Sequence, residues 1–191
     1  MQKRLDVYLS ENNTVKSRSL AASLIKQGSV EVNGRICTKA SFAVDENDNI
    51  RIIGEMPKYV GRGGLKLEKA LSHYRLHLDG SVCIDIGAST GGFTDCMLQN
   101  GAVKVYSVDV GTDQLDEKLR NDPRVVSMEK TDIRNCVGTL PTVDFIGIDV
   151  SFISLKLILP SAYALLKDGG ECVALIKPQF EAGKSHLSKH G

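Results

Sequence analysis

From residue 61 onward, short apolar stretches alternate with longer helical patterns, and this alternation constrains the fold more than any other feature of the sequence. The expected helices cover residues 65–74, 92–99, 114–120 and 155–166, and the expected strands cover residues 82–86, 104–108, 125–128, 143–148 and 172–176. Strands separated by helices need crossover connections, which make the strands parallel and place helices on both faces of the sheet. The sequence therefore predicts an α/β fold for this region.

The first 55 residues carry a different pattern, which predicts a small α+β unit. Apolar spacing near the start indicates one short helix. Ser17 or Ser19 can cap a second helix that continues to Gly28, a residue suited to the left-handed end of a helix. Asn33-Gly34 lies between alternating apolar residues, which is the strongest short signal for a β-hairpin. One more strand is expected at residues 49–53.

We expect two domains, at residues 1–55 and 61–191, joined by a linker at residues 56–60. The net charge is only +1, but the bases gather at the front of the chain. Residues 1–40 hold three acids (Asp6, Glu11 and Glu31) and seven bases (Lys3, Arg4, Lys16, Arg18, Lys26, Arg35 and Lys39). Clustered bases attract polyanions such as RNA. On charge alone, a solvated helix face explains so small a bias at least as well.

The composition excludes several classes of protein. Hydrophobic residues make up 42% of the chain and charged residues 25%, which is typical of a folded globular protein. The longest apolar window, residues 143–166, is interrupted by Asp144, Asp149 and Lys156, so we expect no membrane span. The first residues lack the apolar core of a secretory leader. Five cysteines without a C-x-x-C pair argue against disulfides and zinc, and we expect reduced thiols and a cytoplasmic location.

A glycine-rich loop follows the first strand of the second region, in the sequence DIGASTGGFT at residues 85–94. Gly87, Gly91 and Gly92 allow the backbone to turn tightly and to approach a ligand closely. The spacing is G-x-x-x-G-G rather than G-x-G-x-x-G, and no lysine follows as in a phosphate-binding P-loop. The loop therefore favours neither a dinucleotide nor a nucleoside triphosphate, and by itself it is also compatible with a plain turn.

Carboxylates follow four successive strands of the second region. Asp85 and Asp109 end the first two strands, and Asp132 and Asp149 follow the next two. Any one of them could simply cap a helix or a turn, but in a parallel sheet all four lie at the edge where ligands bind. An acidic rim beside a glycine loop suits a ligand with a ribose, an amino group and a sulfonium. These features together favour S-adenosylmethionine.

Two lysines can complete an active site at the same edge. Lys177 ends the last expected strand, and Lys66 lies near the start of the helix that precedes the first one. Each alone would more often be a solvated surface lysine. With Asp149 between them, however, they form a candidate active site.

These residues lie in motifs that resemble a known family. The carriers are RLDVYL at residues 4–9, YVGRGGLKLEKAL at 59–71, DIGASTGGFTD at 85–95, DVSFISL at 149–155 and LIKPQFE at 175–181. The second region resembles the FtsJ-type ribose 2′-O-methyltransferases, and the whole order of parts is similar to the hemolysin A or TlyA-type ribosomal RNA methyltransferases. The first region resembles the small RNA-binding module of ribosomal protein S4.

The resemblance implies a Rossmann-like methyltransferase sheet, S-adenosylmethionine as cofactor without a metal, and 2′-O-methylation of a ribose, expected on a cytidine of ribosomal RNA. Lys66, Asp149 and Lys177 match three members of the family's Lys-Asp-Lys-Glu catalytic set, with Lys177 as proton acceptor, Asp149 as its orienter and Lys66 as a clamp on the target nucleotide. The residues expected to bind the cofactor are Asp85, Gly87, Ala88, Ser89, Gly91, Gly92, Phe93, Thr94, Asp109, Asp132 and Asp149. Those expected to bind RNA are Arg4, Lys16, Arg18, Lys26 and Arg62.

The fourth catalytic member, a Glu, and the last strands of the usual seven-stranded sheet have no match in residues 1–191. We therefore expect a chain truncated at its C-terminus, in which the strand at residues 172–176 is an exposed edge that promotes self-association.

Three functions remain open at this point. The first is an RNA methyltransferase that acts on ribosomal RNA or ribosomal subunits. The second is a non-catalytic RNA-binding protein with a degenerate methyltransferase domain. The third is membrane lysis, which rests on the hemolysin name alone and is opposed by the lack of a membrane span or an amphipathic basic helix.

Overall fold

The computed structural model describes residues 2–12, 14–15, 17–54 and 57–182. The chain forms two compact units, Met1–Met56 and Pro57–Gly191. Each unit has its own hydrophobic core, so each is described by itself.

The small unit combines two helices with short antiparallel strands. The helices are α1 (Leu5–Glu11) and α2 (Arg18–Lys26). A three-stranded sheet in the order β3-β2-β5 contains β2 (Val30–Val32), β3 (Arg35–Ile36) and β5 (Ile50–Ile52), and β1 (Lys3–Arg4) pairs with β4 (Ala43–Val44). The β1–β4 pair was not predicted, because two-residue strands are too short to show alternation.

The local signals explain where these elements begin and end. Ser17 is the N-cap of α2, since its side chain accepts a hydrogen bond from the backbone N–H of Leu20. Gly28 follows the helix at φ +77°. Asn33 and Gly34 both have positive φ, as a two-residue hairpin turn between β2 and β3 requires. The predicted cap, helix end and hairpin are thus confirmed.

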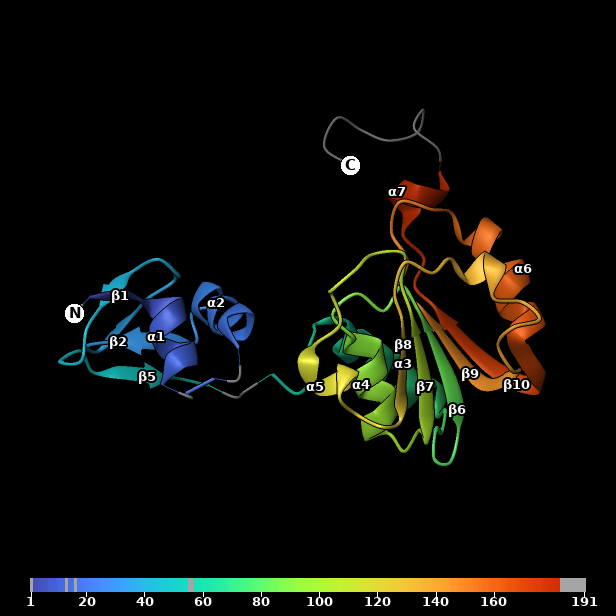
Figure 1. Cartoon of the computed structure of the whole chain (residues 1–191), viewed down its shortest axis with the longest axis horizontal. Helices are drawn as coiled ribbons and strands as arrows, with labels where there is room; N and C mark the ends of the chain where they lie inside the picture. The colour runs from blue at the N-terminus through green and yellow to red at the C-terminus, as the bar shows by residue number, and fades with distance from the viewer. Residues whose placement is uncertain (1, 13, 16, 55–56, 183–191) are drawn as a thin grey trace. The chain divides into compact units, whose positions relative to one another are not determined.

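The large unit contains a five-stranded parallel sheet in the order β10-β9-β6-β7-β8 (Figure 1). Its strands are β6 (Val82–Ile86), β7 (Lys104–Val108), β8 (Val125–Met128), β9 (Val143–Ile148) and β10 (Leu166–Ala174). Its helices are α3 (Gly63–Tyr74), α4 (Gly92–Gln99), α5 (Glu117–Arg120), α6 (Leu155–Leu165) and α7 (Pro178–Glu181), with a 3-10 turn at Ile133–Asn135. The predicted Rossmann-like α/β architecture is confirmed.

Alternate residues of the strands pack into two separate cores, one on each face of this sheet. Phe145 of β9 faces the core formed with α3 and α4, where it joins Leu67 and Met97. Its neighbour Ile146 faces the other core, which includes Ile158 of α6. Figure 1 shows α3 and α4 on one side of the sheet and α6 on the other. Burial on both faces explains why these strands read as continuous apolar runs.

Two predicted elements differ from the structure. The helix expected at 114–120 begins only at Glu117, because Asp116 has a non-helical backbone (φ −56°, ψ 138°) and caps the helix through the N–H of Lys118. The strand expected at 172–176 is replaced by β10, which starts six residues earlier and ends at Ala174. Its register against β9 shifts between Leu166 and Glu171, so two short paired stretches form one strand. No helix in the described part of the chain is long and apolar enough to span a bilayer.

Candidate active site

The strand order reverses at β6, which lies between β7 and β9. In open α/β sheets this reversal creates a crevice at the carboxyl ends of the strands, where ligands bind. Gly87 N, in the loop after β6, donates a hydrogen bond to Val108 O at the end of β7 (2.9 Å). Asp149 N, just after β9, donates a hydrogen bond to Ile86 O at the end of β6 (3.0 Å). The glycine loop and the segment that carries Asp149 are therefore joined at this point.

Gly87 brings these two segments into direct contact. Its φ is +84°, and a Cβ placed on it would lie 2.8 Å from the backbone oxygen of Asp149. A side chain would push the Asp149 segment away from the loop. The glycine is thus required both by its backbone conformation and by the close approach.

A second close approach joins the glycine loop to the start of α3. A Cβ on Gly92 would lie 2.9 Å from Gly64 N and 3.1 Å from Gly61 O. The first turns of α3 and α4 therefore pack backbone against backbone. This contact brings Lys66, near the start of α3, to the carboxyl edge of the sheet, although it precedes the first strand in sequence.

The three predicted catalytic side chains form one ion-paired cluster. Lys177 Nζ lies 2.7 Å from Asp149 Oδ1, and Lys66 Nζ lies 3.6 Å from Asp149 Oδ2. Lys177 also donates a hydrogen bond to Ser151 Oγ (2.8 Å). The side chains of Asp149 and Lys177 are 18% and 21% exposed, whereas that of Lys66 is 54% exposed. Lys177 is thus held in place, and Lys66 remains accessible to a large ligand.

Glu181 joins the two loops that carry this cluster. Its carboxylate accepts hydrogen bonds from Ser154 Oγ (2.6 Å) and from Leu155 N (2.8 Å), at the start of α6. The backbone N–H of Leu155 contributes most to holding the pKa of Glu181 below its usual range. Because α7 begins right after Lys177 and α6 begins shortly after Asp149, this bond fixes the spacing between the loops.

Asp85 lies beneath the glycine loop and is fully buried. Its Oδ2 accepts hydrogen bonds from Thr94 N (2.9 Å) and Thr94 Oγ1 (2.7 Å), and that hydroxyl also contacts Ser107 Oγ (2.7 Å). Its Oδ1 is buried without a hydrogen-bond partner among the described residues. Burial raises the pKa of Asp85 to about 7, and the neighbouring charges of Asp149 and Asp109 add to the shift.

A small hollow opens between the loops that follow β6, β7 and β8. Asp109 closes one side, since its two carboxylate oxygens accept hydrogen bonds from Ser89 N and Gly111 N, each at 2.7 Å. The lining residues are Ala88, Ser89, Ser107, Asp109, Gly111, Gln114, Leu115, Ser127 and Glu129. The hollow offers polar and carboxylate groups of the kind that bind ribose hydroxyls and amines.

Several expected cofactor residues occupy other positions. The side chains of Phe93 and Thr94 are buried beneath the loop, where they pack against or hydrogen-bond to protein. Asp132 is not among the residues that line the hollow; Arg134 pairs with its carboxylate at 2.6 Å and holds its pKa below the usual range. Gln114 and Glu129 line the hollow but were missed, because no motif marks them.

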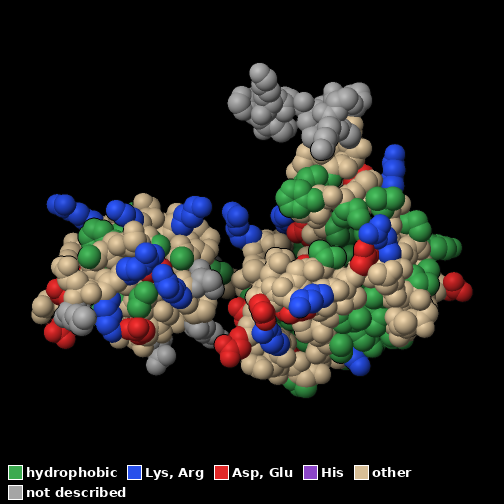
Figure 2. Space-filling view, turned by 45° about the horizontal axis from the view of Figure 1, so that its top comes forward, with side chains coloured by type: hydrophobic (Ala, Val, Ile, Leu, Met, Phe, Trp, Pro, Cys, Tyr) green, Lys and Arg blue, Asp and Glu red, His purple; other side chains and the backbone are tan. Residues whose placement is uncertain are grey.

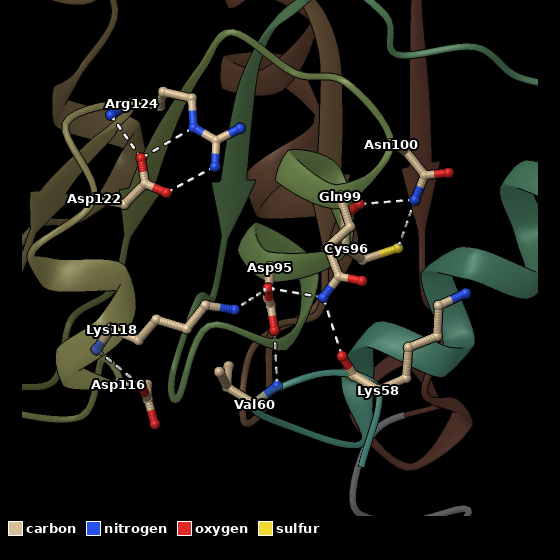
Figure 3. Close-up of polar contacts among 10 residues, drawn as sticks. All are labelled: Lys58, Val60, Asp95, Cys96, Gln99, Asn100, Asp116, Lys118, Asp122 and Arg124. Atoms are coloured by element: carbon tan, nitrogen blue, oxygen red, sulfur yellow. Dashed lines mark hydrogen bonds and ion pairs between the residues drawn. The ribbon is translucent and has the colours of Figure 1, made fainter. Parts of the chain in front are cut away.

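The segment before α3 is anchored by Asp95 of α4 (Figure 3). This carboxylate is 2% exposed and accepts a hydrogen bond from the backbone N–H of Val60 at 2.9 Å. It also accepts one from Gln99 Nε2 (3.0 Å) and pairs with Lys118 Nζ (3.2 Å). Gln99 in turn donates to the carbonyl of Lys58. Asp95 therefore ties the entry of α3 to both α4 and the segment at α5.

Comparison with known proteins identifies the large unit. Residues 59–191 match the FtsJ-like methyltransferases. The chain belongs to the FtsJ-like methyltransferase family. Residues 3–50 match the S4 domain, so the small unit is an S4 domain that precedes the methyltransferase unit.

Known relatives are similar over nearly the whole chain. Hemolysin A of Brachyspira hyodysenteriae is 45% identical, with 98% of this chain and 79% of that protein aligned. The 16S/23S rRNA (cytidine-2'-O)-methyltransferase TlyA of Mycobacterium tuberculosis is 39% identical, with 98% and 71% aligned. A solved structure from Streptococcus thermophilus, classed as a candidate hemolysin, is 47% identical, has a TM-score of 0.71 and covers 98% of this chain and 70% of its own.

The methyltransferase unit carries an exposed aromatic residue beside the ion-paired cluster. Phe152, three residues after Asp149, is 91% exposed and has a φ of +64°. Its ring centroid lies 5.1 Å from that of Phe180, which is three residues after Lys177. An exposed ring at this position is suited to stack on a nucleobase.

The expected RNA-binding residues lie on the surfaces of both units. Arg4, Arg18 and Lys26 are exposed on the S4 domain, and Figure 2 shows Lys and Arg side chains over much of its visible surface. Arg62 is exposed at the start of α3 in the methyltransferase unit. Lys16 lies outside the described residues. Among the described residues, no group of three or more His, Cys, Asp or Glu side chains is arranged to hold a metal ion.

Proposed function

We propose that this protein transfers a methyl group from S-adenosylmethionine to the 2′-hydroxyl of a cytidine ribose in ribosomal RNA. The observation that carries the proposal is the Lys66–Asp149–Lys177 cluster, which lies at the carboxyl edge of a methyltransferase sheet next to the glycine loop. The relative from Mycobacterium tuberculosis is named for this reaction on 16S and 23S ribosomal RNA.

The residues at the sheet edge fit the methyl donor. Asp85 offers a buried carboxylate oxygen without a partner in the described structure, which suits a cationic amino group. Asp109 and Glu129 line the adjacent hollow and can accept hydrogen bonds from ribose hydroxyls. When bound, S-adenosylmethionine supplies a methyl group attached to a positively charged sulfur.

The lysine cluster provides what the RNA hydroxyl lacks. A ribose hydroxyl is a weak nucleophile at neutral pH, so its proton must be removed as it attacks. The neutral amine of Lys177 is the proton acceptor, and Asp149 and Ser151 fix the position of its Nζ atom. The ion-paired ammonium is the form that results once the proton has been taken up. Lys66, which is more exposed, contacts the target nucleotide through its charge. In-line positioning of the hydroxyl is the larger contribution of the fold.

Two further features support an RNA substrate. The S4 domain carries exposed bases, which contact phosphates without reading sequence. Phe152 offers a stacking surface for an unpaired base next to Lys177. A ribosomal RNA substrate and the free cysteines of the described structure favour action in the cytoplasm.

The test measures methyl incorporation from labelled S-adenosylmethionine into ribosomal RNA. We expect Lys177→Met to lower the rate by about 100-fold or more while donor binding persists, since general-base catalysis contributes roughly 10²–10⁴. Lys167→Met is the matched control, because Lys167 forms a similar 2.6 Å ion pair with Asp144 at the opposite end of the sheet. Donor binding without incorporation into any ribosomal RNA by the parent protein would favour the non-catalytic alternative.

A further inference from the structure

The S4 domain contains a nearly buried carboxylate that holds two arginines. Asp6, the second residue of α1, has a side chain that is 4% exposed. Arg4 donates from Nε to Oδ1 (2.9 Å) and from Nη2 to Oδ2 (3.0 Å), and Arg18 donates from Nε to Oδ2 (2.9 Å). The backbone N–H of Val7 adds a fourth hydrogen bond to Oδ1 (3.1 Å). Both carboxylate oxygens are thus fully engaged.

The two arginines come from different elements and remain open to solvent. Arg4 belongs to β1 and Arg18 is the first residue of α2. Their side chains are 49% and 58% exposed. A guanidinium carries five N–H donors, so each arginine can hold Asp6 and still donate to another group. The arrangement therefore presents two fixed guanidinium groups at one place on the surface.

A single arginine would satisfy this carboxylate, so the second needs an explanation. Two guanidinium groups repel each other unless an anion lies between them. Asp6 supplies that anion and leaves a net charge of +1 on the three side chains. Hydrogen bonds from Arg4, and then from Arg18, lower the pKa of Asp6 to about 2, so it stays charged at neutral pH. The spacing of the pair is set before any ligand arrives.

We propose that Asp6 is a positioning residue that holds Arg4 and Arg18 as a clamp for one phosphate group of the RNA backbone. Two guanidinium groups with fixed orientation match the several oxygens of a phosphate, which a flexible lysine pair would not. This proposal rests on the proposed function, because it assumes that the S4 domain binds the RNA substrate. It adds which residues of that domain provide part of the affinity for RNA.

The sign of the Asp6→Asn effect separates positioning from simple electrostatics. Removing a negative charge from an RNA-binding surface should strengthen binding if charge alone matters. If Asp6 positions the arginines, Asp6→Asn should instead weaken binding of a fluorescent ribosomal RNA hairpin by about 10-fold, the loss expected for a charge-assisted contact. Glu11→Gln is the matched control, since Glu11 also lies on α1 and pairs with a base, Lys3, at 2.6 Å. We expect that variant to bind equally or more tightly.

Salt dependence distinguishes the removal of a phosphate contact from a merely loosened domain. The slope of log affinity against log salt should fall in magnitude by roughly 0.7 to 0.9 in Asp6→Asn for each phosphate that the variant no longer neutralises. Arg18→Lys retains the charge without the planar fork and should weaken binding similarly. If Asp6→Asn is unfolded by circular dichroism, Arg18→Lys provides the deciding measurement.

Each outcome bears on the proposal. Binding by Asp6→Asn as tight as by Glu11→Gln, or parental binding by Arg18→Lys, would overturn it. The double variant Arg4→Ala with Arg18→Ala tests whether these two arginines contact the RNA at all: unchanged RNA affinity would overturn the clamp. Methyl incorporation by the parent protein, which does not depend on this clamp being right, separately tests the proposed function.

Discussion

At the scale of single residues, the buried Asp85 carboxyl predicts a pH dependence for donor binding. Its pKa is about 7 in the folded chain against an ordinary value of 3.8, because burial disfavours the charge. From about pH 4 to pH 7 the folded state keeps a proton that the unfolded state has lost, so stability without donor should fall over this range and level off above it. A cationic amino group needs the carboxylate, so donor affinity should rise as pH increases through 7.

Calorimetry at pH 6 and pH 8, with the parent and Asp85→Asn, tests this prediction. The variant should bind S-adenosylmethionine weakly at both pH values, and its affinity should not increase between pH 6 and pH 8 as that of the parent does. Titration of the donor itself is common to both proteins and cancels in the comparison. An equal pH dependence in the variant would show that another group is responsible.

Gly87 makes a second prediction at this scale, with a control of nearly identical backbone conformation. Gly87→Ala should destabilise the fold by about 1–3 kcal/mol and weaken donor binding, because the new Cβ would meet the backbone of Asp149. Gly138 has a φ of +83° against +84°, but its Cβ would meet no atom within 4 Å. Gly138→Ala should therefore destabilise the fold by only about 1 kcal/mol, which is the cost of a left-handed backbone conformation at a residue other than glycine.

Chemical denaturation of the two alanine variants gives both stabilities, and calorimetry gives donor affinity. The difference between them measures the close approach alone. Equal losses would mean that the contact between the glycine loop and the Asp149 segment has no energetic role.

At the scale of elements, Asp95 couples the entry of α3 to α4. Asp95→Ala should destabilise the methyltransferase unit by roughly 2–3 kcal/mol, because it leaves the backbone N–H of Val60 without its partner and removes a charge-assisted contact with Lys118. Methyl transfer should fall as well, since Lys66 lies on the helix that this contact anchors. Denaturation and single-turnover kinetics measure the two effects.

Asp122→Ala is the control for this variant. Asp122 pairs with Arg124 at 2.7 Å near the surface, where ion pairs contribute about 0–1 kcal/mol. Figure 3 shows both carboxylates in the same view, each with its cation. Because Asp122 also accepts a hydrogen bond from the nearby backbone N–H of Arg124 (2.9 Å), a similar loss in the two variants would indicate that the burial of Asp95 and its bond to the distant Val60 add nothing to stability.

At the scale of the whole molecule, the edge strand β10 predicts self-association. Among the described residues β10 pairs with β9 alone, so its other edge presents unpaired backbone groups. We expect a concentration-dependent increase in mass by sedimentation, and Cys172→Lys should reduce it, because a charge on an edge strand opposes pairing. Val103→Lys is the control, because it places the same charge at an exposed site just before β7, which has a neighbouring strand on each side. We expect no change in self-association for this variant. A monomer at all concentrations would contradict the expectation.

The sequence by itself determined the architecture and pointed to all three side chains of the ion-paired cluster. Helical spacing, apolar runs and turn residues such as Asn33-Gly34 record local backbone preferences and burial, which depend on neighbours along the chain. Lys66, Asp149 and Lys177 could be named because each lies in a motif at an element boundary. The same local rules missed the late start of the helix at Glu117, since an N-cap conformation at Asp116 overrides propensity.

Only the tertiary structure decided which side chains meet. Lys66 lies within ion-pair distance of Asp149 because Gly92 lets α4 pack against the backbone of α3. Asp149 meets Lys177 because the neighbouring parallel strands β9 and β10 end at the same edge of the sheet, and no local pattern encodes either contact. The hollow lined by Gln114 and Glu129, and the arginine pair around Asp6, likewise depend on contacts between separate elements. Burial and electrostatics are properties of such contacts, so the unpaired oxygen of Asp85 and its raised pKa exist only once the chain has folded.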